Sequence, residues 1–80
     1  MEEVVLLSSS RCSYCDVMKD RLNRMGIKFR EVKIESDEGK RMVREHGIKG
    51  LPATIINKKG KKSILIGLVP ENELIKEVRQ

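Results

Sequence analysis

The chain has 80 residues, of which 36% are charged and 39% hydrophobic, and its 17 Lys and Arg against 12 Asp and Glu give a formal net charge of +5. This length accommodates one hydrophobic core, so we expect a single domain over residues 1–80. Two cysteines are too few for a disulfide scaffold, and no apolar run is long enough to span a membrane. The chain begins Met-Glu-Glu, which is acidic where a secretory signal is basic, and we therefore expect a cytoplasmic protein.

The first predicted strand and helix surround the two cysteines. Residues 3–7 are apolar on both faces, which favours a buried central strand, and three serines follow them. A helix is predicted over residues 13–25, ending at Gly26, because apolar side chains recur there at helical spacing. These side chains are Cys15, Met18, Leu22 and Met25.

A second strand and helix are predicted in the middle of the chain. Residues 28–34 have the pattern of a strand. Ser36 or Asp37 can cap the next helix, because a short polar side chain can accept a hydrogen bond from a free amide in the first turn. Gly47 is placed to end that helix.

A hairpin and a last helix complete the predicted elements. Strands are expected over residues 53–57 and 63–66, joined by a lysine-rich turn that contains Gly60. Pro70 suits the first position of a helix, where its missing N–H group does no harm. The apolar face of this helix is predicted to consist of Leu74, Ile75 and Val78.

The predicted order of elements is β-α-β-α-β-β-α. A strand-helix-strand unit implies a right-handed crossover between parallel strands, and the closing hairpin is antiparallel. The sequence therefore predicts an α/β fold, with a mixed four-stranded sheet flanked by three helices.

The cysteine pair has the position of a redox centre. Cys12 is predicted to lie at the N-cap or in the first turn of a helix, where free amides and the helix dipole favour a thiolate, and Arg11 adds a positive neighbour. Cys15 lies nearly one turn further on, on the buried face. We therefore expect Cys12 to be the attacking nucleophile and Cys15 to be the resolving thiol, without cofactor or metal.

Two other interpretations of these features stay open. The pair could be part of a metal or iron–sulfur site, although the only other soft ligand is His46 and a closed zinc site usually needs four ligands. The lysines of residues 58–62 could contact nucleic acid. We expect no such partner, because the net charge is modest and the aromatic side chains that stack on bases are nearly absent.

The chain resembles the thioredoxin/glutaredoxin superfamily over nearly its whole length. The resemblance rests on the order and spacing of several motifs, and the short length and Tyr14 are most similar to a glutaredoxin. The motifs are Cys12-Ser13-Tyr14-Cys15, Gly47-Ile48-Lys49-Gly50-Leu51-Pro52, and Ile66-Gly67 followed by a helix that begins at a proline.

The resemblance implies a thioredoxin-like fold and a substrate-binding surface around the cysteines. It implies a cis peptide bond between Leu51 and Pro52, next to the cysteine pair, with the backbone of Leu51 pairing with an extended substrate segment. It also implies that Gly67 leaves space for that segment and that Arg11 and Tyr14 lie beside the substrate.

Departures from the family pattern bear on the reductant. Glutathione-binding relatives usually carry a lysine three residues before the first cysteine, where this chain has Ser9. They usually have Thr-Val before the cis-proline, where this chain has Gly50-Leu51. Near the last helix they usually have Gly-Gly followed by an acidic residue, where this chain has Gly67-Leu68-Val69. We therefore expect a monomeric protein disulfide oxidoreductase that is recharged by a thioredoxin-type reductase. A glutathione-dependent glutaredoxin is the alternative.

Overall fold

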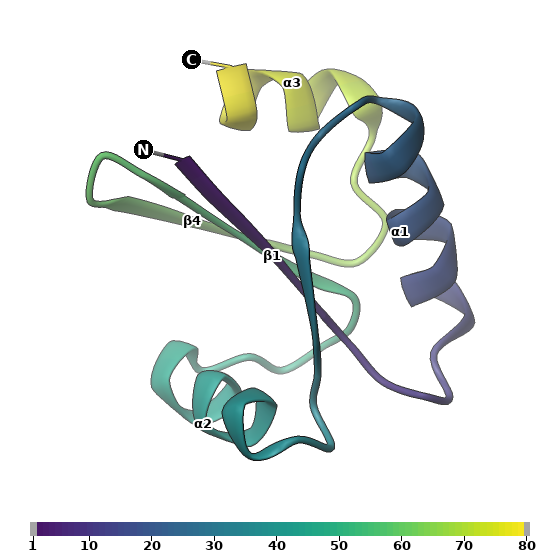
Figure 1. The fold of residues 1–80 in the computed structure, drawn as a ribbon, viewed down its shortest axis with the longest axis vertical. Coiled ribbons are helices and arrows are strands. Elements are labelled where there is room, and N and C mark those ends of the chain that lie inside the picture. The colour runs from purple at the N-terminus through teal and green to yellow at the C-terminus, as the bar shows by residue number, and fades with distance from the viewer. Residues whose placement is uncertain (1, 80) are drawn as a thin grey trace.

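The computed structural model describes residues 2–79, which form one four-stranded sheet and three helices (Figure 1). The strands follow the order β2-β1-β3-β4 across the sheet. Strand β1 pairs with β2 in parallel and with β3 antiparallel, and β3 pairs with β4 antiparallel. The elements are β1 (Glu2–Ser8), α1 (Ser13–Arg24), β2 (Arg30–Lys33), α2 (Asp37–His46), β3 (Ala53–Lys58), β4 (Lys61–Ile66) and α3 (Glu71–Arg79). The predicted mixed four-stranded sheet and its element order are confirmed.

The sheet has helices on both faces, and β1 is buried between them. Val5 and Leu7 point to the α2 side, where they pack with Val32 of β2. Leu6 points to the opposite side and packs against residues of α1 and α3. Figure 1 shows α2 on one side of the sheet and α1 and α3 on the other. This two-sided burial explains why β1 is a continuous apolar run. None of the helices described has the length and apolar character needed to cross a bilayer.

Helix α2 has local signals at both ends. The hydroxyl of Ser36 accepts a hydrogen bond from the amide of Gly39 at 3.0 Å, so Ser36, and not Asp37, is the N-cap. Gly47 ends the helix in the left-handed conformation, with φ of 62°. Inside the helix, position 39 requires glycine, because a Cβ atom there would overlap the backbone carbonyl of Lys33.

Some predicted boundaries and one predicted face were wrong. Strand β2 begins at Arg30, because the preceding Phe29 packs into the core under α1 and α3 and does not pair with β1. Pro70 precedes α3, and its carbonyl accepts hydrogen bonds from two amides of the first turn. Ile75 remains 41% exposed, whereas Leu74 and Val78, which are one turn apart, are buried.

The β3–β4 hairpin is tighter than the sequence indicated. Lys58 pairs directly with Lys61, so the loop contains only Lys59 and Gly60, and both have positive φ values, 52° and 84°. A two-residue loop with two positive φ values matches the right-handed twist of the strands. Strand β4 therefore begins at Lys61 and not at Ser63.

Candidate functional site

The two cysteines are joined by a disulfide at the start of α1. Their Cα atoms lie 5.2 Å apart. Cys12 is the N-cap of the helix and has an extended backbone, with φ of −108° and ψ of 102°. Its Sγ atom accepts a hydrogen bond from the amide of Cys15 at 3.1 Å. The structure therefore places Cys12 at the helix N-terminus that the sequence indicated.

The two sulfur atoms have different surroundings. Cys15 is only 2% exposed and belongs to the buried face of α1 with Met18 and Leu22. Cys12 is half-buried and lies at the end of the helix. An outside reactant can therefore approach Cys12 more easily than Cys15, which is the asymmetry that ordered disulfide exchange requires.

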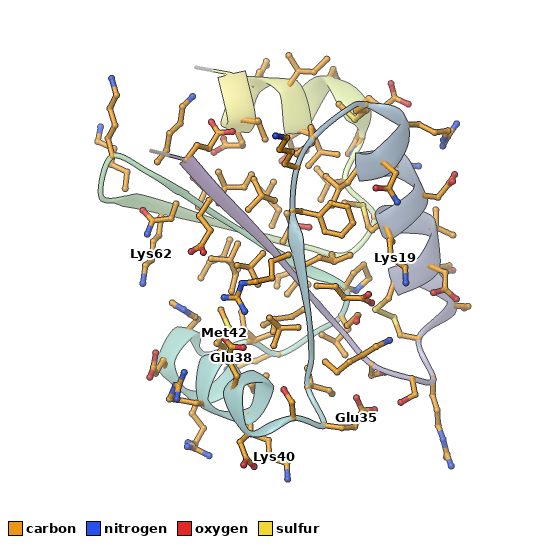
Figure 2. The ribbon with its side chains drawn as sticks, in the orientation of Figure 1. Lys19, Glu35, Glu38, Lys40, Met42 and Lys62 are labelled. Carbon is orange, nitrogen blue, oxygen red and sulfur yellow. A yellow bond between two sulfur atoms is a disulfide. The ribbon has the colours of Figure 1, made fainter. Side chains whose placement is uncertain are left out.

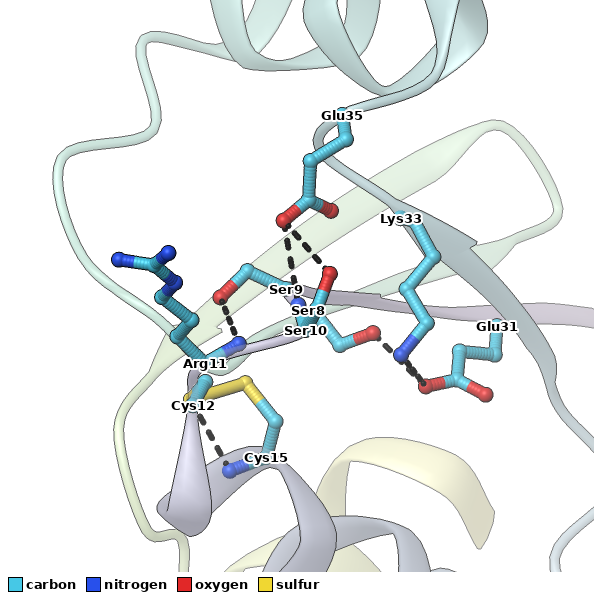
Figure 3. Close-up of a disulfide and its surroundings, with 9 residues drawn as sticks. All are labelled: Ser8, Ser9, Ser10, Arg11, Cys12, Cys15, Glu31, Lys33 and Glu35. Carbon is cyan, nitrogen blue, oxygen red and sulfur yellow. Dashed lines mark hydrogen bonds and ion pairs between the residues drawn. A yellow bond between two sulfur atoms is a disulfide. The ribbon is translucent and has the colours of Figure 1, made fainter.

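The loop before Cys12 is tied to the turn before α2 (Figure 3). The carboxylate of Glu35 accepts hydrogen bonds from the backbone amide and the hydroxyl of Ser10, at 3.1 and 3.0 Å. The bond from the Ser10 amide is the main reason that the pKa of Glu35 lies below its usual value. Ser9 contributes through its hydroxyl, which accepts a bond from the amide of Arg11 at 3.3 Å. These bonds hold the loop that presents Cys12.

A polar cluster made of Ser8, Lys19, Glu31 and Lys33 adjoins the disulfide. The buried hydroxyl of Ser8 donates to Glu31 at 2.7 Å, and the ammonium groups of Lys19 and Lys33 lie 3.3 and 3.4 Å from the same carboxylate. The Ser8 hydrogen bond is the largest cause of a lowered pKa of Glu31, and both lysines act in the same direction. Lys19 follows Cys15 by one helical turn, so the cluster lies on the side of α1 that carries the buried cysteine.

Glu31 was not among the site residues predicted from the sequence. The signal was nevertheless present. Val32 points to the α2 side, so alternation along β2 places Glu31 on the α1 side, facing the helix that carries Cys15. Lys19 of α1 is its ion-pair partner.

The Leu51–Pro52 peptide bond is cis, as the family resemblance implied. Pro52 immediately precedes Ala53, which is the register partner of Leu7, so the cis bond lies at the end of the sheet where β1 leads to the cysteines. The amide of Gly67 donates to the carbonyl of Pro52 at 2.8 Å. The structure therefore brings Pro52 and Gly67 together at the cysteine end of the sheet.

The remaining predicted site residues lie at the edges of this region. Tyr14 is 60% exposed in the first turn of α1, and Leu51 packs against the core on the α2 side. Arg11 is exposed, and in Figure 3 its side chain points away from the disulfide. Ile66 and Leu68 flank Gly67 and are exposed, a feature that the sequence did not reveal.

Residues 2–79 contain no group of three or more His, Cys, Asp or Glu side chains arranged to hold a metal ion. The two cysteines are the obvious soft ligands, and both are used in the disulfide in this structure.

Solved structures similar to this chain include thioredoxins and a thioredoxin-like protein, and they confirm the predicted thioredoxin-like fold. Mitochondrial thioredoxin 3 from Saccharomyces cerevisiae, in its oxidised form, is 20% identical with a TM-score of 0.78, covering 98% of this chain and 76% of that one. An uncharacterised thioredoxin-like protein from Clostridium perfringens is 15% identical with a TM-score of 0.85, covering 99% and 69%. Thioredoxin from Malassezia sympodialis is 19% identical with a TM-score of 0.75, covering 98% and 73%. At these identities the similarity establishes the fold.

The family is established by sequence. No curated protein matches the chain. The family model described as Glutaredoxin matches residues 4–60, which is more than half of the chain and includes both cysteines and the cis-proline. The chain therefore belongs to the glutaredoxin family of the thioredoxin/glutaredoxin superfamily.

Proposed function

We propose that this protein is a thiol–disulfide oxidoreductase that reduces disulfides in other proteins. The observation that carries the proposal is the Cys12–Cys15 disulfide at the N-terminus of α1, at the same end of the sheet as the cis bond before Pro52. The glutaredoxin family match supports the same chemistry.

The reaction begins with both cysteines reduced. The Cys12 thiolate attacks one sulfur of the substrate disulfide, forms a mixed disulfide and releases the other substrate sulfur as a thiolate. Cys15 then loses its proton and attacks the Sγ atom of Cys12. The Cys12–Cys15 disulfide forms and the second substrate sulfur leaves as a thiolate. The substrate has gained two electrons, which a reductase must return to the cysteine pair.

Cys15 has to lose a proton in the second step, although it is buried. The polar cluster of Ser8, Lys19, Glu31 and Lys33 borders the same face of α1. Glu31 is a carboxylate on the side of β2 that faces α1, and its lowered pKa makes it a weak base, so it can hold the Cys15 proton only in transit. We assign to this cluster the role of receiving the Cys15 proton and passing it to solvent.

A protein substrate fits the surface around the disulfide better than glutathione does. Exposed Ile66 and Leu68 flank Gly67 beside Pro52 and offer apolar contact to a peptide segment. The backbone of Leu51 is the proposed edge for pairing with that segment. The lysine and Thr-Val usual in glutathione-binding relatives are replaced by Ser9 and Gly50-Leu51. A thioredoxin-type reductase is therefore the proposed electron donor, in a compartment such as the cytoplasm that keeps thiols reduced.

Trapping the mixed disulfide tests this function. Cys15→Ser removes the resolving thiol, so the variant should accumulate a covalent complex with a disulfide-bonded substrate such as insulin, and dithiothreitol should release it. Cys12→Ser is the matched variant and should form no complex and reduce no substrate. Reduction of insulin by Cys12→Ser at the wild-type rate would refute the proposed nucleophile.

Glutathione dependence is the competing function, because Tyr14 matches the glutathione-binding pattern and the family match is to glutaredoxin. Turnover should be measured with glutathione and glutathione reductase, and separately with NADPH and a thioredoxin reductase. We expect turnover only in the second assay. Turnover with glutathione alone would replace the proposed reductant.

A further inference from the structure

A pocket lies at the opposite end of the sheet from the disulfide. It has a volume of about 630 Å³ and lies between the β3–β4 hairpin and α3. Glu2, at the start of β1, pairs with Lys58, whereas the cysteines follow the far end of that strand. The pocket is lined by Ile56, Lys58, Lys59, Lys61, Ser63, Lys76 and Glu77.

The strand register concentrates lysines on the face that lines the pocket. Lys58 and Lys61 are direct partners across the hairpin, so their side chains leave the same face of the sheet. Ile56, two residues before Lys58, packs against Val78, so this face is the one that α3 covers. Lys76 of α3 also lines the pocket. Like charges placed directly opposite each other destabilise a hairpin, so this arrangement lacks a structural benefit of its own.

Lys62 shows that not every lysine of the hairpin points to the pocket face of the sheet. It is the neighbour of Lys61 but pairs with Asn57, so it points to the other face of the sheet. In Figure 2 Lys62 extends away from α3. Lys62 does not line the pocket.

The ammonium group of Lys58 is the most informative atom in the pocket. It is buried, and it has no hydrogen-bond partner among the described residues. Two carboxylates are in the neighbourhood, that of Glu77 in the lining and that of Glu2 opposite Lys58. The ion pairs found among residues 2–79 include neither of them with any lysine of the pocket. A buried cation without a partner is unfavourable, and a bound anion would supply the missing partner.

We propose that this pocket binds a small anion that carries phosphate groups. Lysines from the β3–β4 hairpin and from α3 line one pocket, and this favours a ligand with at least two negative charges, because lysine pairs with phosphate as a point charge. The hydroxyl of Ser63 can add a hydrogen bond to a phosphate oxygen. A small ligand is favoured over nucleic acid, because neither aromatic residue of the chain lines the pocket to stack on a base.

Pyrophosphate is the probe for this site. Titration calorimetry at about 0.15 M NaCl suppresses long-range surface attraction, because the Debye length is then about 8 Å. We expect saturable binding to one site per chain and a rise in the melting temperature of the protein with pyrophosphate. Absence of saturable binding would overturn the proposal, as would binding of a single-stranded oligonucleotide without binding of pyrophosphate.

Three variants locate the site. Lys58→Met keeps the apolar stem but removes the ammonium group, and it should weaken pyrophosphate binding at least about tenfold, a loss in the range expected for a hydrogen bond to a charged group. Lys61→Gln should weaken binding several-fold. Lys62→Gln removes one charge from the same hairpin on the other face and should leave binding within about twofold of wild type. Equal losses in Lys61→Gln and Lys62→Gln would mean diffuse surface attraction and would overturn the proposal.

Folding and redox activity separate a lost site from a damaged protein. Lys58→Met removes a buried cation without a partner, so the free variant should be at least as stable as wild type while losing the stabilisation by pyrophosphate. Its disulfide reductase activity should be unchanged, because the pocket and the disulfide lie at opposite ends of the sheet. A variant that is stable and still binds pyrophosphate like wild type would show that Lys58 is not part of an anion site.

Discussion

The reactivity of Cys12 in the reduced protein can be predicted from the contacts of its sulfur atom. The perturbation is reduction combined with Cys15→Ser, which leaves Cys12 as the only thiol and keeps the amide at position 15. That amide lies 3.1 Å from the Cys12 sulfur. A hydrogen bond to a charged group contributes about 1.5–3 kcal/mol, and a helix N-terminus contributes about 0.3–1 kcal/mol.

A net stabilisation of the thiolate by about 2 kcal/mol, near the lower end of that sum, raises its population about 30-fold at a pH where most thiols are protonated. The stabilised thiolate is also a weaker nucleophile, and a Brønsted slope of about 0.4–0.5 reduces its rate about four- to fivefold. Cys12 should therefore be alkylated about sixfold faster than an ordinary thiol.

Alkylation by iodoacetamide at about pH 6, followed by mass spectrometry, measures this rate. The reference is a peptide of residues 9–18 with the same Cys15→Ser change, which has the local sequence without the helix packed on the sheet. The folded Cys12→Ser variant is the matched control, and its buried Cys15 should react more slowly than a cysteine in a peptide. If folded Cys12 reacts no faster than the peptide, the helix N-terminus does not activate it and the assigned mechanism fails.

Three further predictions concern stability, each measured by urea unfolding. Leu22→Ala should lower the free energy of unfolding by about 3 kcal/mol, because Leu22 is fully buried. Ile75→Ala should lower it by less than about 1 kcal/mol, because Ile75 is exposed. Similar losses in the two variants would contradict the assignment of Leu22 to the core. Gly39→Ala should destabilise by at least about 1 kcal/mol, because the new methyl group meets the backbone of Lys33, and a gain in stability would show that the contact relaxes. Because the pKa of Glu31 is lowered in the folded protein, its carboxylate stabilises the fold fully above the usual carboxyl pKa of 4.5, and this contribution is lost as the pH falls through the lower folded value. Glu31→Gln should therefore be less stable than wild type at pH 7 and should lose less stability on acidification. Parallel plots of unfolding free energy against pH for the two proteins would refute this linkage.

The cysteine pair and its position could be predicted from local sequence alone. An apolar run followed by a helical repeat places Cys12 at a helix N-terminus, and the helical spacing places Cys15 on the buried side. A cap at Ser36 or Asp37 and the helix end at Gly47 were predicted for the same reason, because capping depends on residues within one turn, and the structure selects Ser36. The cis bond before Pro52 required the family resemblance, since an X-Pro sequence permits either isomer.

The contacts of Glu31 and Lys58 depended on the tertiary structure. Glu31 meets Ser8, which lies 23 positions earlier in the chain, only because β2 pairs in parallel with β1. The lysines of residues 58–62 read as one basic cluster, but the two-residue loop and the strand register divide them between two faces of the sheet.

The sequence by itself determined which segments are strands and helices and where the two cysteines stand, because periodicity, caps and turns act over a few neighbouring residues. The tertiary structure decided which distant residues meet: the polar cluster near Cys15, the backbone bond between Pro52 and Gly67, and the pocket that Lys58 lines. The physical reason is that side-chain direction alternates along a strand, so a shift of one residue in register would send the side chains of Glu31 and Lys58 to the opposite face.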